Sequence, residues 1–395
     1  MFDLDSVPAT SNARKTIERG VSGACSTRKI RIAVVSDAAP HRNGVGAYYQ
    51  DLHQHLKARG GDLLMLCPVI ENGKWHGGLT FPLPGDATQK CFMPSPFGLW
   101  RKLRAYKPDV VIVPTPGLYG IFGAFLGKRL GVKVIVGFHT WYEKLTEMYW
   151  DSWQEKITRG YFGVSNKILF KYADHTVVNS EFMVTAAAEV GAHNIELVGT
   201  PVSFDFIHTP LAPSTGRLHK VIFAGRLAAE KNLDAIIAAA QQLPELQFSV
   251  AGDGPEKAKI QSAAKTLPNL NYFGWLNRAE LLAAVDDHDA LVLPSHVESF
   301  GTVALEAMAR EKLVVVSEHC GIAHWRSLRT GLITIKTSQT LAHTLRQVMV
   351  LDESTRLEYA RKARICAVEL NEWSLDRWRE LIDSTLSIVS HEIAS

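Results

Sequence analysis

Two glutamates in one short stretch have the residue types and the spacing to bind the hydroxyl groups of a ligand. Glu298 and Glu306 are separated by seven residues in the segment "ESFGTVALE". A carboxylate accepts hydrogen bonds from both hydroxyls of a vicinal diol, as an acidic residue does with ribose in dinucleotide-binding folds. Between the two acids, Phe300, Gly301 and Thr302 fall at the expected start of a helix, where free backbone N–H groups attract anions.

Each of these acids also has a plainer explanation. Glu298, placed just before a helix, would stabilise the positive end of the helix dipole. Glu306, inside the helix, would be a buried structural acid paired with a nearby cation. Taken alone, each acid is slightly better explained by the plainer role.

Two cations follow another expected strand at a turn of the same kind. The segment "KVIFAGR" has the continuous apolar character of a buried strand and ends at Arg226, and Lys231 lies five residues further on. Cations at a strand-to-helix turn suit a diphosphate, because the helix dipole and the free amides add to their charge. The alternative is that both are solvated cations on a surface loop.

The elements that must position these residues follow one pattern, which occurs twice. Short apolar runs alternate with longer helical stretches from residue 29 and again from residue 219, which predicts parallel strands with helices between them. The expected fold class is α/β, with two Rossmann-like, doubly wound domains facing a cleft and ligands at the carboxyl ends of the strands. A segment rich in Pro, Ser and Thr separates the two halves.

These patterns predict the organisation of the chain. We expect a polar, mobile lead-in over residues 1–28 and a first Rossmann-like domain over residues 29–204. A linker over residues 205–218 precedes a second Rossmann-like domain over residues 219–369. A terminal helix over residues 370–395 is expected to cross back to the first domain.

Composition narrows the class of protein further. The chain has 395 residues, which favours two domains, and a net charge of only +3, which gives no field for nucleic acid. Its five cysteines form no C-x-x-C pair, which argues against a zinc site or a disulfide framework. No apolar run is long enough to span a membrane, and the first 20 residues contain acids and no signal-peptide core.

The segment "GRLAAEKN", followed by "PSHVESFGTVALEAMA", resembles the signature of the retaining family-4 glycosyltransferases of GT-B fold. The resemblance extends roughly from residue 29 to the C-terminus. It implies that Arg226 and Lys231 hold the diphosphate of a nucleotide-sugar donor. It also implies that Glu298 contacts hydroxyls of the donor sugar and Glu306 contacts the ribose. The first domain would then take the acceptor and the second the donor.

Other positions of the motif carry further expectations. Gly44, in "NGVG", resembles the glycine-rich loop of the family, although Asn43 stands where the family commonly has glycine. His139, after "VIVGF", matches a histidine near the donor sugar, the alternative being a core histidine. The loop over residues 318–331 departs from the family, since it lacks the usual Gly-Gly and Pro-Glu pairs. The amides expected to meet donor oxygens belong to Phe300, Gly301 and Thr302.

An aromatic stretch is the strongest sign of an acceptor. Residues 141–172 contain nine aromatic and five basic residues, against 9% aromatic residues in the whole chain. A helix of this composition can lie at a membrane interface, or its rings can pack as a core stripe. The start of the stretch resembles members that add hexoses to diacylglycerol or related lipids, and two further basic-apolar patches lie at residues 97–107 and 120–131. The candidate acceptor or membrane contacts are Trp141, Tyr142, Tyr149, Trp150 and Trp153.

The resemblance predicts a retaining transfer of a hexose, or a hexuronic acid-type sugar, from a nucleotide-diphospho-sugar to a membrane lipid such as diacylglycerol. A UDP-sugar is the donor expected from the habit of the family. The residues expected to carry the reaction are His139, Glu298, Arg226 and Lys231. A soluble saccharide acceptor and a non-catalytic nucleotide-sugar binder are the alternatives.

We expect no cofactor beyond the nucleotide sugar as co-substrate. The D-x-D sequence from Asp287 to Asp289 precedes its strand and so falls at the end of the sheet away from the donor, which predicts metal-independent catalysis. The expected partners are the donor, the lipid acceptor and the membrane surface, with no nucleic acid. The expected location is cytoplasmic, peripheral on the inner face of the membrane.

Overall fold

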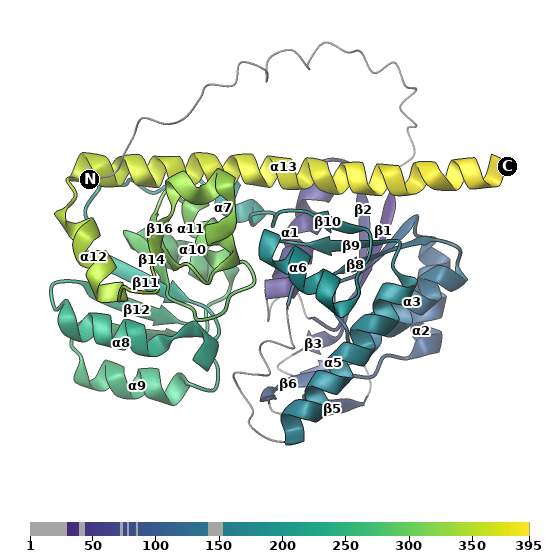
Figure 1. Ribbon diagram of the computed structural model, residues 1–395, viewed down its shortest axis with the longest axis horizontal. Coiled ribbons are helices and arrows are strands. Elements are labelled where there is room, and N and C mark those ends of the chain that lie inside the picture. The colour runs from purple at the N-terminus through teal and green to yellow at the C-terminus, as the bar shows by residue number, and fades with distance from the viewer. Residues whose placement is uncertain are drawn as a thin grey trace, which may run out of the picture.

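Two parallel six-stranded sheets with helices on both faces form the body of the protein, as Figure 1 shows. The computed structural model describes residues 30–38, 44–71, 74–76, 79–83, 86–140 and 153–394. The expected lead-in over residues 1–28 lies outside these residues. The predicted α/β fold with two Rossmann-like halves is confirmed.

The first sheet contains strands from the N-terminal half only. Its central strands are buried on both faces, as parallel strands covered by helices are, which explains their unbroken Val and Ile content. In spatial order the strands are β10 (Ile195–Leu197), β9 (His175–Val178), β8 (Lys133–Gly137), β7 (Val110–Val113), β1 (Arg31–Val35) and β2 (Asp62–Leu66).

In the part of the chain that the structure describes, six helices precede the second sheet, and two antiparallel hairpins lie between β2 and the second of these helices. The hairpins pair β3 (Val69–Glu71) with β4 (Lys74–His76) and β5 (Thr80–Leu83) with β6 (Asp86–Phe92), and neither follows from the strand-and-helix pattern of the sequence. The helices are α1 (Gly44–Ala58), α2 (Pro96–Tyr106), α3 (Leu118–Arg129), α5 (Trp153–Tyr172), α6 (Glu181–Val190) and α7 (Phe204–His208).

The second sheet follows the same rule. Its strands are β13 (Leu270–Gly274), β12 (Gln247–Ala251), β11 (Lys220–Ala224), β14 (Ala290–Leu293), β15 (Leu313–Ser317) and β16 (Ile333–Ile335). Its helices are α8 (Leu233–Gln242), α9 (Lys257–Thr266), α10 (Arg278–Asp287), α11 (Thr302–Ala309) and α12 (Leu341–Val350), with the 3₁₀ turns η1 (Ala229–Lys231), η2 (Gly321–His324) and η3 (Arg326–Gly331).

One long helix, α13 (Glu353–Ala394), runs along both halves (Figure 1). Its first part places Ala363, Ala367 and Leu370 in the core of the second half. Its later part places Leu375 and Trp378 in a core of the first half, against one face of the first sheet. The helix passes without a break through position 370, where the sequence predicts that a terminal helix begins. Because α13 is part of both cores, it connects the two halves.

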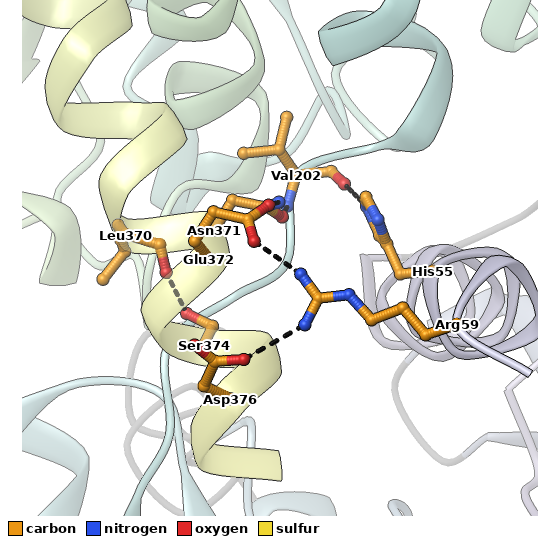
Figure 2. Close-up of polar contacts among 8 residues, drawn as sticks. All are labelled: His55, Arg59, Val202, Leu370, Asn371, Glu372, Ser374 and Asp376. Atoms are coloured by element: carbon orange, nitrogen blue, oxygen red, sulfur yellow. Dashed lines mark hydrogen bonds and ion pairs between the residues drawn. The ribbon is translucent and has the colours of Figure 1, made fainter. Parts of the chain in front are cut away.

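The junction of α13 with the first half also contains polar contacts, which Figure 2 shows. The buried Asn371 side chain accepts a hydrogen bond of 2.9 Å from the backbone N–H of Val202. The carbonyl of Val202 lies 2.8 Å from a ring nitrogen of His55 in α1. At the surface, Arg59, directly after α1, pairs with Glu372 and Asp376 of α13. The segment that leads from the first half to the second is thus held between α1 and α13.

Candidate active site

The two cations predicted from the sequence lie beside one buried acid. Arg226 follows β11, and its Nη1 lies 3.8 Å from Oε1 of Glu230, which η1 buries. Lys231 ends η1, and its ammonium forms an ion pair with Glu298. The side chain of Lys231 is 14% exposed and that of Arg226 is 30% exposed, so Arg226 is the more accessible of the two.

The charges of this cluster depend on one another. Burial disfavours the Lys231 ammonium, but the carboxylates of Glu298 and Glu230 outweigh it and raise the pKa of Lys231. Burial raises the pKa of Glu230, with Lys231 lowering it in part. Oε2 of Glu230 is buried and has no hydrogen-bond partner in the part of the chain that the structure describes. The acids of the cluster therefore keep the Lys231 side chain protonated and positively charged.

A glycine allows the turn after β11 to pack against the turn after β12. Gly252, at the end of β12, has φ +140°, and a Cβ added there would lie 1.8 Å from the carbonyl oxygen of Gly225. The backbone amide of Gly225 in turn donates to the carbonyl of Ala251 at 3.0 Å. No residue with a side chain fits this approach, so Gly252 fixes where the chain continues toward Arg226.

The turn that carries Glu298 is held by backbone bonds. The carbonyl of Glu298 accepts from the amide of Gly321 at 2.9 Å, and that of Phe300 accepts from Ile322 at 2.8 Å. The Phe300 ring is buried against Trp325, so its side chain is not exposed to a ligand. Gly301 caps α11 at φ +104° without a side-chain bond, and Thr302 begins the helix. This is the arrangement expected of an anion-binding helix N-terminus.

Glu306 occupies a different environment from Glu298. It is 1% exposed, and its Oε1 lies 2.7 Å from Nη1 of Arg278, at the start of α10. Arg278 also reaches the first half, where its Nη2 lies 3.1 Å from Oδ2 of Asp51 in α1. The structure thus places Glu306 in a buried ion pair, as the plainer reading of the sequence expects. Contact with a ribose would require Glu306 to exchange Arg278 for the hydroxyls.

The first half contributes Gly44 and His139 at the carboxyl ends of its strands. Gly44 begins α1, and a Cβ added there would meet no atom of the described residues within 4 Å. His139 follows β8 and is 4% exposed. Burial lowers the pKa of His139 to about 3, so the ring is neutral at physiological pH.

The two halves touch near these residues. The Ser180 hydroxyl, just after β9, donates to the carbonyl of Ser299 at 3.0 Å. The Trp325 indole N–H donates to the carbonyl of Asn179 at 3.0 Å. The turn of Glu298 is therefore anchored to the carboxyl-end edge of the first sheet, where ligands bind in open α/β folds.

Comparison with known proteins identifies the family. Residues 42–206 match the model of "Glycosyltransferase Family 4", and residues 213–365 match that of "Glycosyl transferases group 1". Together the two models account for most of the chain and for both sheets. The chain is a family-4 glycosyltransferase of GT-B fold.

Related glycosyltransferases differ in what their names say they transfer. The chain is 25% identical to the sulfoquinovosyl transferase of Arabidopsis thaliana, over 74% of this chain and 60% of that protein. It is 27% identical to a GDP-mannose-dependent alpha-mannosyltransferase of Mycolicibacterium smegmatis, over 77% of this chain and 84% of that protein. The chain thus spans less than two thirds of the plant relative.

Solved structures agree on the fold. The sucrose-phosphate synthase of Thermosynechococcus elongatus has a TM-score of 0.68 at 16% identity, over 93% of this chain and 100% of that chain. A protein of Anabaena in complex with UDP-glucose has a TM-score of 0.65 at 15% identity, over 91% of this chain and 99% of that chain. At these identities the likeness concerns the fold alone.

The D-x-D sequence from Asp287 to Asp289 lies at the amino end of β14, as its place before that strand predicts. Asp289 accepts from the backbone amides of His219 and Lys220 at 2.8 Å, and Asp287 forms an ion pair with the Lys220 side chain. Both acids thus have structural partners far from Lys231. Among the residues that the structure describes, no group of His, Cys, Asp and Glu fits a metal ion.

The expected acceptor contacts fall largely on residues that are not described. Trp141, Tyr142, Tyr149 and Trp150 lie outside the described residues. Trp153 begins α5, but its side chain is not among those described. No helix within the described ranges is both long and apolar enough to span a membrane.

Sequence reasoning missed two residues of the site. Arg278 pairs with Glu306, and no local pattern marks it, because its partners lie 28 and 227 positions away. Tyr49 contacts His139, and here a signal existed: the Tyr48-Tyr49 pair directly follows the glycine-rich loop. A helix residue so close to that loop faces the carboxyl ends of the strands.

Proposed function

We propose that this glycosyltransferase moves a hexose, or a hexuronic acid-type sugar, from a nucleotide-diphospho-sugar to a membrane lipid such as diacylglycerol, with retention at the anomeric carbon. The observation that carries the donor side is the cluster of Arg226, Lys231 and Glu298 at the carboxyl ends of the second sheet. UDP is the nucleotide that we propose for the donor. GDP is the alternative, because several relatives are named for GDP-mannose.

In the proposed reaction the bond between the anomeric carbon and the diphosphate oxygen breaks, and the diphosphate leaves with the electron pair. The hydroxyl oxygen of the acceptor bonds to the anomeric carbon, and its proton passes to the leaving diphosphate. Arg226 and Lys231 would stabilise the negative charge that grows on the diphosphate, which is the largest electrostatic contribution available in the cluster. The amides of Phe300, Gly301 and Thr302 would add hydrogen bonds to donor oxygens.

Glu298 is assigned to binding and not to covalent catalysis. A retaining glycosidase uses two carboxyl groups about 5 Å apart, one of them a free nucleophile. Here Glu298 is engaged by Lys231, and Glu306 is buried with Arg278. We therefore assign Glu298 to the hydroxyls of the donor sugar, with neutral His139 as a hydrogen-bond partner of the same sugar. Closure of the halves would bring Gly44 toward the donor phosphates.

The assignment of Arg226 and Lys231 to the donor diphosphate is tested by Arg226→Ala and Lys231→Ala. Each variant should lower kcat/KM about 10²–10³-fold, the usual loss when one charge-stabilising donor is removed. Lys220→Ala is the matched control, since Lys220 is a cation of the same sheet in an exposed ion pair at the opposite end. Activity near wild type in both Arg226→Ala and Lys231→Ala would contradict the assignment of these residues to the diphosphate.

The donor and acceptor are tested together by mass spectrometry. UDP-glucose, UDP-galactose, UDP-glucuronate, UDP-sulfoquinovose and GDP-mannose are offered with diacylglycerol. A glycolipid from a UDP-sugar supports the proposal, and NMR of the product gives the anomer. Product from GDP-mannose alone contradicts the choice of base, and product only with added oligosaccharide contradicts the lipid.

A basic and apolar surface on the first half supports the membrane part of the proposal. On α2, Phe97 is 75% exposed, and Arg101 and Arg104 are exposed beside it. Phe125 of α3, 46% exposed, contacts Tyr172 of α5. Exposed apolar side chains flanked by cations are suited to an anionic bilayer surface.

Vesicle binding tests this surface. The protein should sediment with vesicles of phosphatidylcholine and phosphatidylserine, and less with phosphatidylcholine alone. Phe97→Ser should weaken that binding about tenfold, given the transfer free energy of a phenylalanine side chain. Val350→Ser is the control, because Val350 is 87% exposed on the second half. If the protein neither binds anionic vesicles nor forms a lipid product, a soluble acceptor is favoured. The same result would contradict a peripheral location on the membrane.

A further inference from the structure

His139 lies in an aromatic cage built by α1 and α13. The ring centroids of Tyr48 and Tyr49 are 4.8 and 5.5 Å from that of the histidine. Trp378 of α13 packs edge-on against both tyrosines. All four side chains are buried, with His139 at 4% exposure. The cage determines where the two ring nitrogens of His139 point.

One of those nitrogens has a protein partner. Nε2 of His139 lies 2.8 Å from the hydroxyl oxygen of Tyr49. In the part of the chain that the structure describes, the Tyr49 hydroxyl has no other hydrogen-bond partner. A buried hydroxyl proton requires an acceptor, so Tyr49 donates and Nε2 accepts. Neutral imidazole then carries its proton on Nδ1.

The other nitrogen has none. Nδ1 of His139 is buried without a hydrogen-bond partner among the described residues. A buried N–H group left unpaired costs free energy, about 1–3 kcal/mol, unless a ligand accepts from it. His139 also borders a small cavity with Pro114, Thr140 and Asn166 at the carboxyl-end edge of the first sheet. The unpaired donor therefore lies on the side of the fold where ligands bind.

We infer that Tyr49 is a positioning residue, which holds His139 as the Nδ1–H tautomer so that Nδ1–H donates a hydrogen bond to an oxygen of the donor sugar. The inference rests on the proposed function, because it takes the donor sugar as the partner of His139. It adds a residue that the glycosyltransferase motif does not contain and fixes the direction of the hydrogen bond. A ring of the other tautomer would present a bare nitrogen, which can only accept, so the direction of the hydrogen bond with a sugar hydroxyl would be reversed.

The surroundings leave the pair little freedom. A Cβ added at Gly137 would lie 2.6 Å from both Nε2 of His139 and the Tyr49 hydroxyl, so glycine is required for the two groups to meet. The neighbouring Tyr48 is anchored separately, because its hydroxyl accepts from Trp378 at 2.8 Å and donates to the carbonyl of Gly199 at 3.2 Å. α1 is thereby fixed against α13 at the residue before Tyr49.

Nitrogen NMR of the full chain tests the tautomer directly. Protein labelled with ¹⁵N-histidine is recorded at neutral pH, and His139→Asn assigns the signals of His139 among the 15 histidines. The expected result is an Nδ1–H ring in wild type and a changed or mixed tautomer in Tyr49→Phe. An Nε2–H ring in wild type, or identical spectra for wild type and Tyr49→Phe, would overturn the inference.

Kinetics test the consequence, with Tyr48→Phe as the control. Tyr48→Phe keeps the ring over His139 and loses only the bonds to Trp378 and Gly199. Tyr49→Phe should lower kcat about tenfold and change the donor KM less than twofold, since the contact is realised fully in the transition state. Tyr48→Phe should keep both values near wild type.

The two readouts separate a failure of the inference from a failure of the proposed function. If the tautomer changes in Tyr49→Phe but kcat does not, Tyr49 sets the tautomer but His139 makes no contact that matters to the reaction. The proposed contact of His139 with the donor sugar is then wrong, and the positioning role fails with it. If kcat falls in Tyr49→Phe and Tyr48→Phe alike, the cage acts through packing, which also overturns it. His139→Asn should retain more activity than His139→Gln, because the shorter amide places its N–H near the position of Nδ1.

Discussion

Lys231 and Glu298 neutralise each other, yet each is assigned a separate part of the donor. The carboxylate of Glu298 helps keep Lys231 charged, and at the same time it occupies the ammonium that a diphosphate would need. Binding of a donor therefore requires an exchange, in which phosphate oxygens replace the carboxylate at Lys231 and sugar hydroxyls replace the ammonium at Glu298. The two exchanges compensate each other only when the ligand carries both groups.

This exchange predicts opposite effects of Glu298→Gln on two ligands. A nucleoside diphosphate without a sugar should bind as well as to wild type or up to about tenfold more tightly, because Lys231 no longer has a competing carboxylate. Turnover of the intact nucleotide sugar should fall at least about tenfold, since the sugar loses a charged hydrogen-bond acceptor. Calorimetry with UDP and initial rates measure the two effects. Weaker binding of UDP would contradict the exchange.

The neutral ring of His139 has a consequence for stability. Its pKa is lowered by burial from 6.5 to about 3, so between these values the unfolded chain binds a proton that the folded protein does not. The contribution of His139 to the free energy of unfolding is therefore fully present above pH 6.5 and decreases as the pH falls. Between pH 6.5 and 5 the loss from this group should be about 2 kcal/mol.

His139→Asn removes the titration and so provides the comparison. Urea unfolding of both proteins at several pH values should show the wild type losing about 2 kcal/mol more than the variant on going from pH 6.5 to 5. Parallel curves would mean that His139 is already protonated or accessible in the folded protein. The size of the difference does not depend on which substrate the enzyme uses.

At the scale of elements, the junction of α1 and α13 contains two kinds of polar contact that should differ in strength. Asn371 is 1% exposed, and its loss leaves the buried amide of Val202 without an acceptor. Arg59 pairs with Glu372 and Asp376 at the surface, where both acids are more than half exposed. A buried unpaired amide costs more than an exposed ion pair contributes.

Asn371→Ala should therefore lower the free energy of unfolding by about 1–3 kcal/mol, and Arg59→Ala by less than about 1 kcal/mol. Chemical denaturation of the full chain measures both. Because the two residues lie at one junction (Figure 2), the comparison separates burial from location. Equal losses would contradict the prediction that the buried amide matters more than the surface ion pairs.

The elements themselves were largely predictable from the sequence, and the exceptions have a physical cause. Strands such as β11 and β14 are apolar on both faces and follow turn residues, so local composition is enough to identify them. The hairpins β3–β4 and β5–β6 consist of short strands with Gly, Pro and charged residues nearby. Their pairing depends on the partner strand more than on composition.

The site was predictable to the same degree. Arg226, Lys231 and Glu298 follow strand ends, and all strand ends of a parallel sheet meet at one edge. Their proximity therefore follows from topology. The partner of Glu306 does not, because a buried acid accepts any cation that the tertiary fold brings to it. Arg278 comes from the start of α10 and also reaches α1, a combination that exists only once both halves are packed.

At the scale of the whole molecule, Arg278 is a charged connection between the halves. It joins Glu306 of the second half to Asp51 of the first, and the side chains of the two acids are 2% and 5% exposed. Burial raises the pKa of Asp51 to about 7, with Arg278 lowering it and Glu306 raising it. If a ribose takes Glu306 from Arg278, the guanidinium is left with Asp51 alone. Donor binding would then alter a contact that holds the halves together.

Arg278→Ala tests how much of the connection between the halves depends on this residue. Two buried carboxylates lose their cation, so the free energy of unfolding should fall by about 3–5 kcal/mol at pH 7.5. The effect should be smaller at pH 6. The raised pKa of Asp51 means that the folded protein takes up a proton as the pH falls through 7, which relieves the unpaired charge. Arg377→Ala is the control, because Arg377 joins α13 to Glu196 at the surface.

A double-mutant cycle makes the test specific to the contact between halves. Arg278→Ala combined with Asp51→Asn should lose less than the sum of the two single variants, with a coupling energy above about 1 kcal/mol. Small-angle scattering should show a larger radius of gyration for Arg278→Ala than for Arg377→Ala if the pair restrains opening. If the losses are additive and the scattering is unchanged, α13 and not Arg278 determines how the two halves are positioned relative to each other. The ribose could then exchange with Arg278 at Glu306 without any effect on closure.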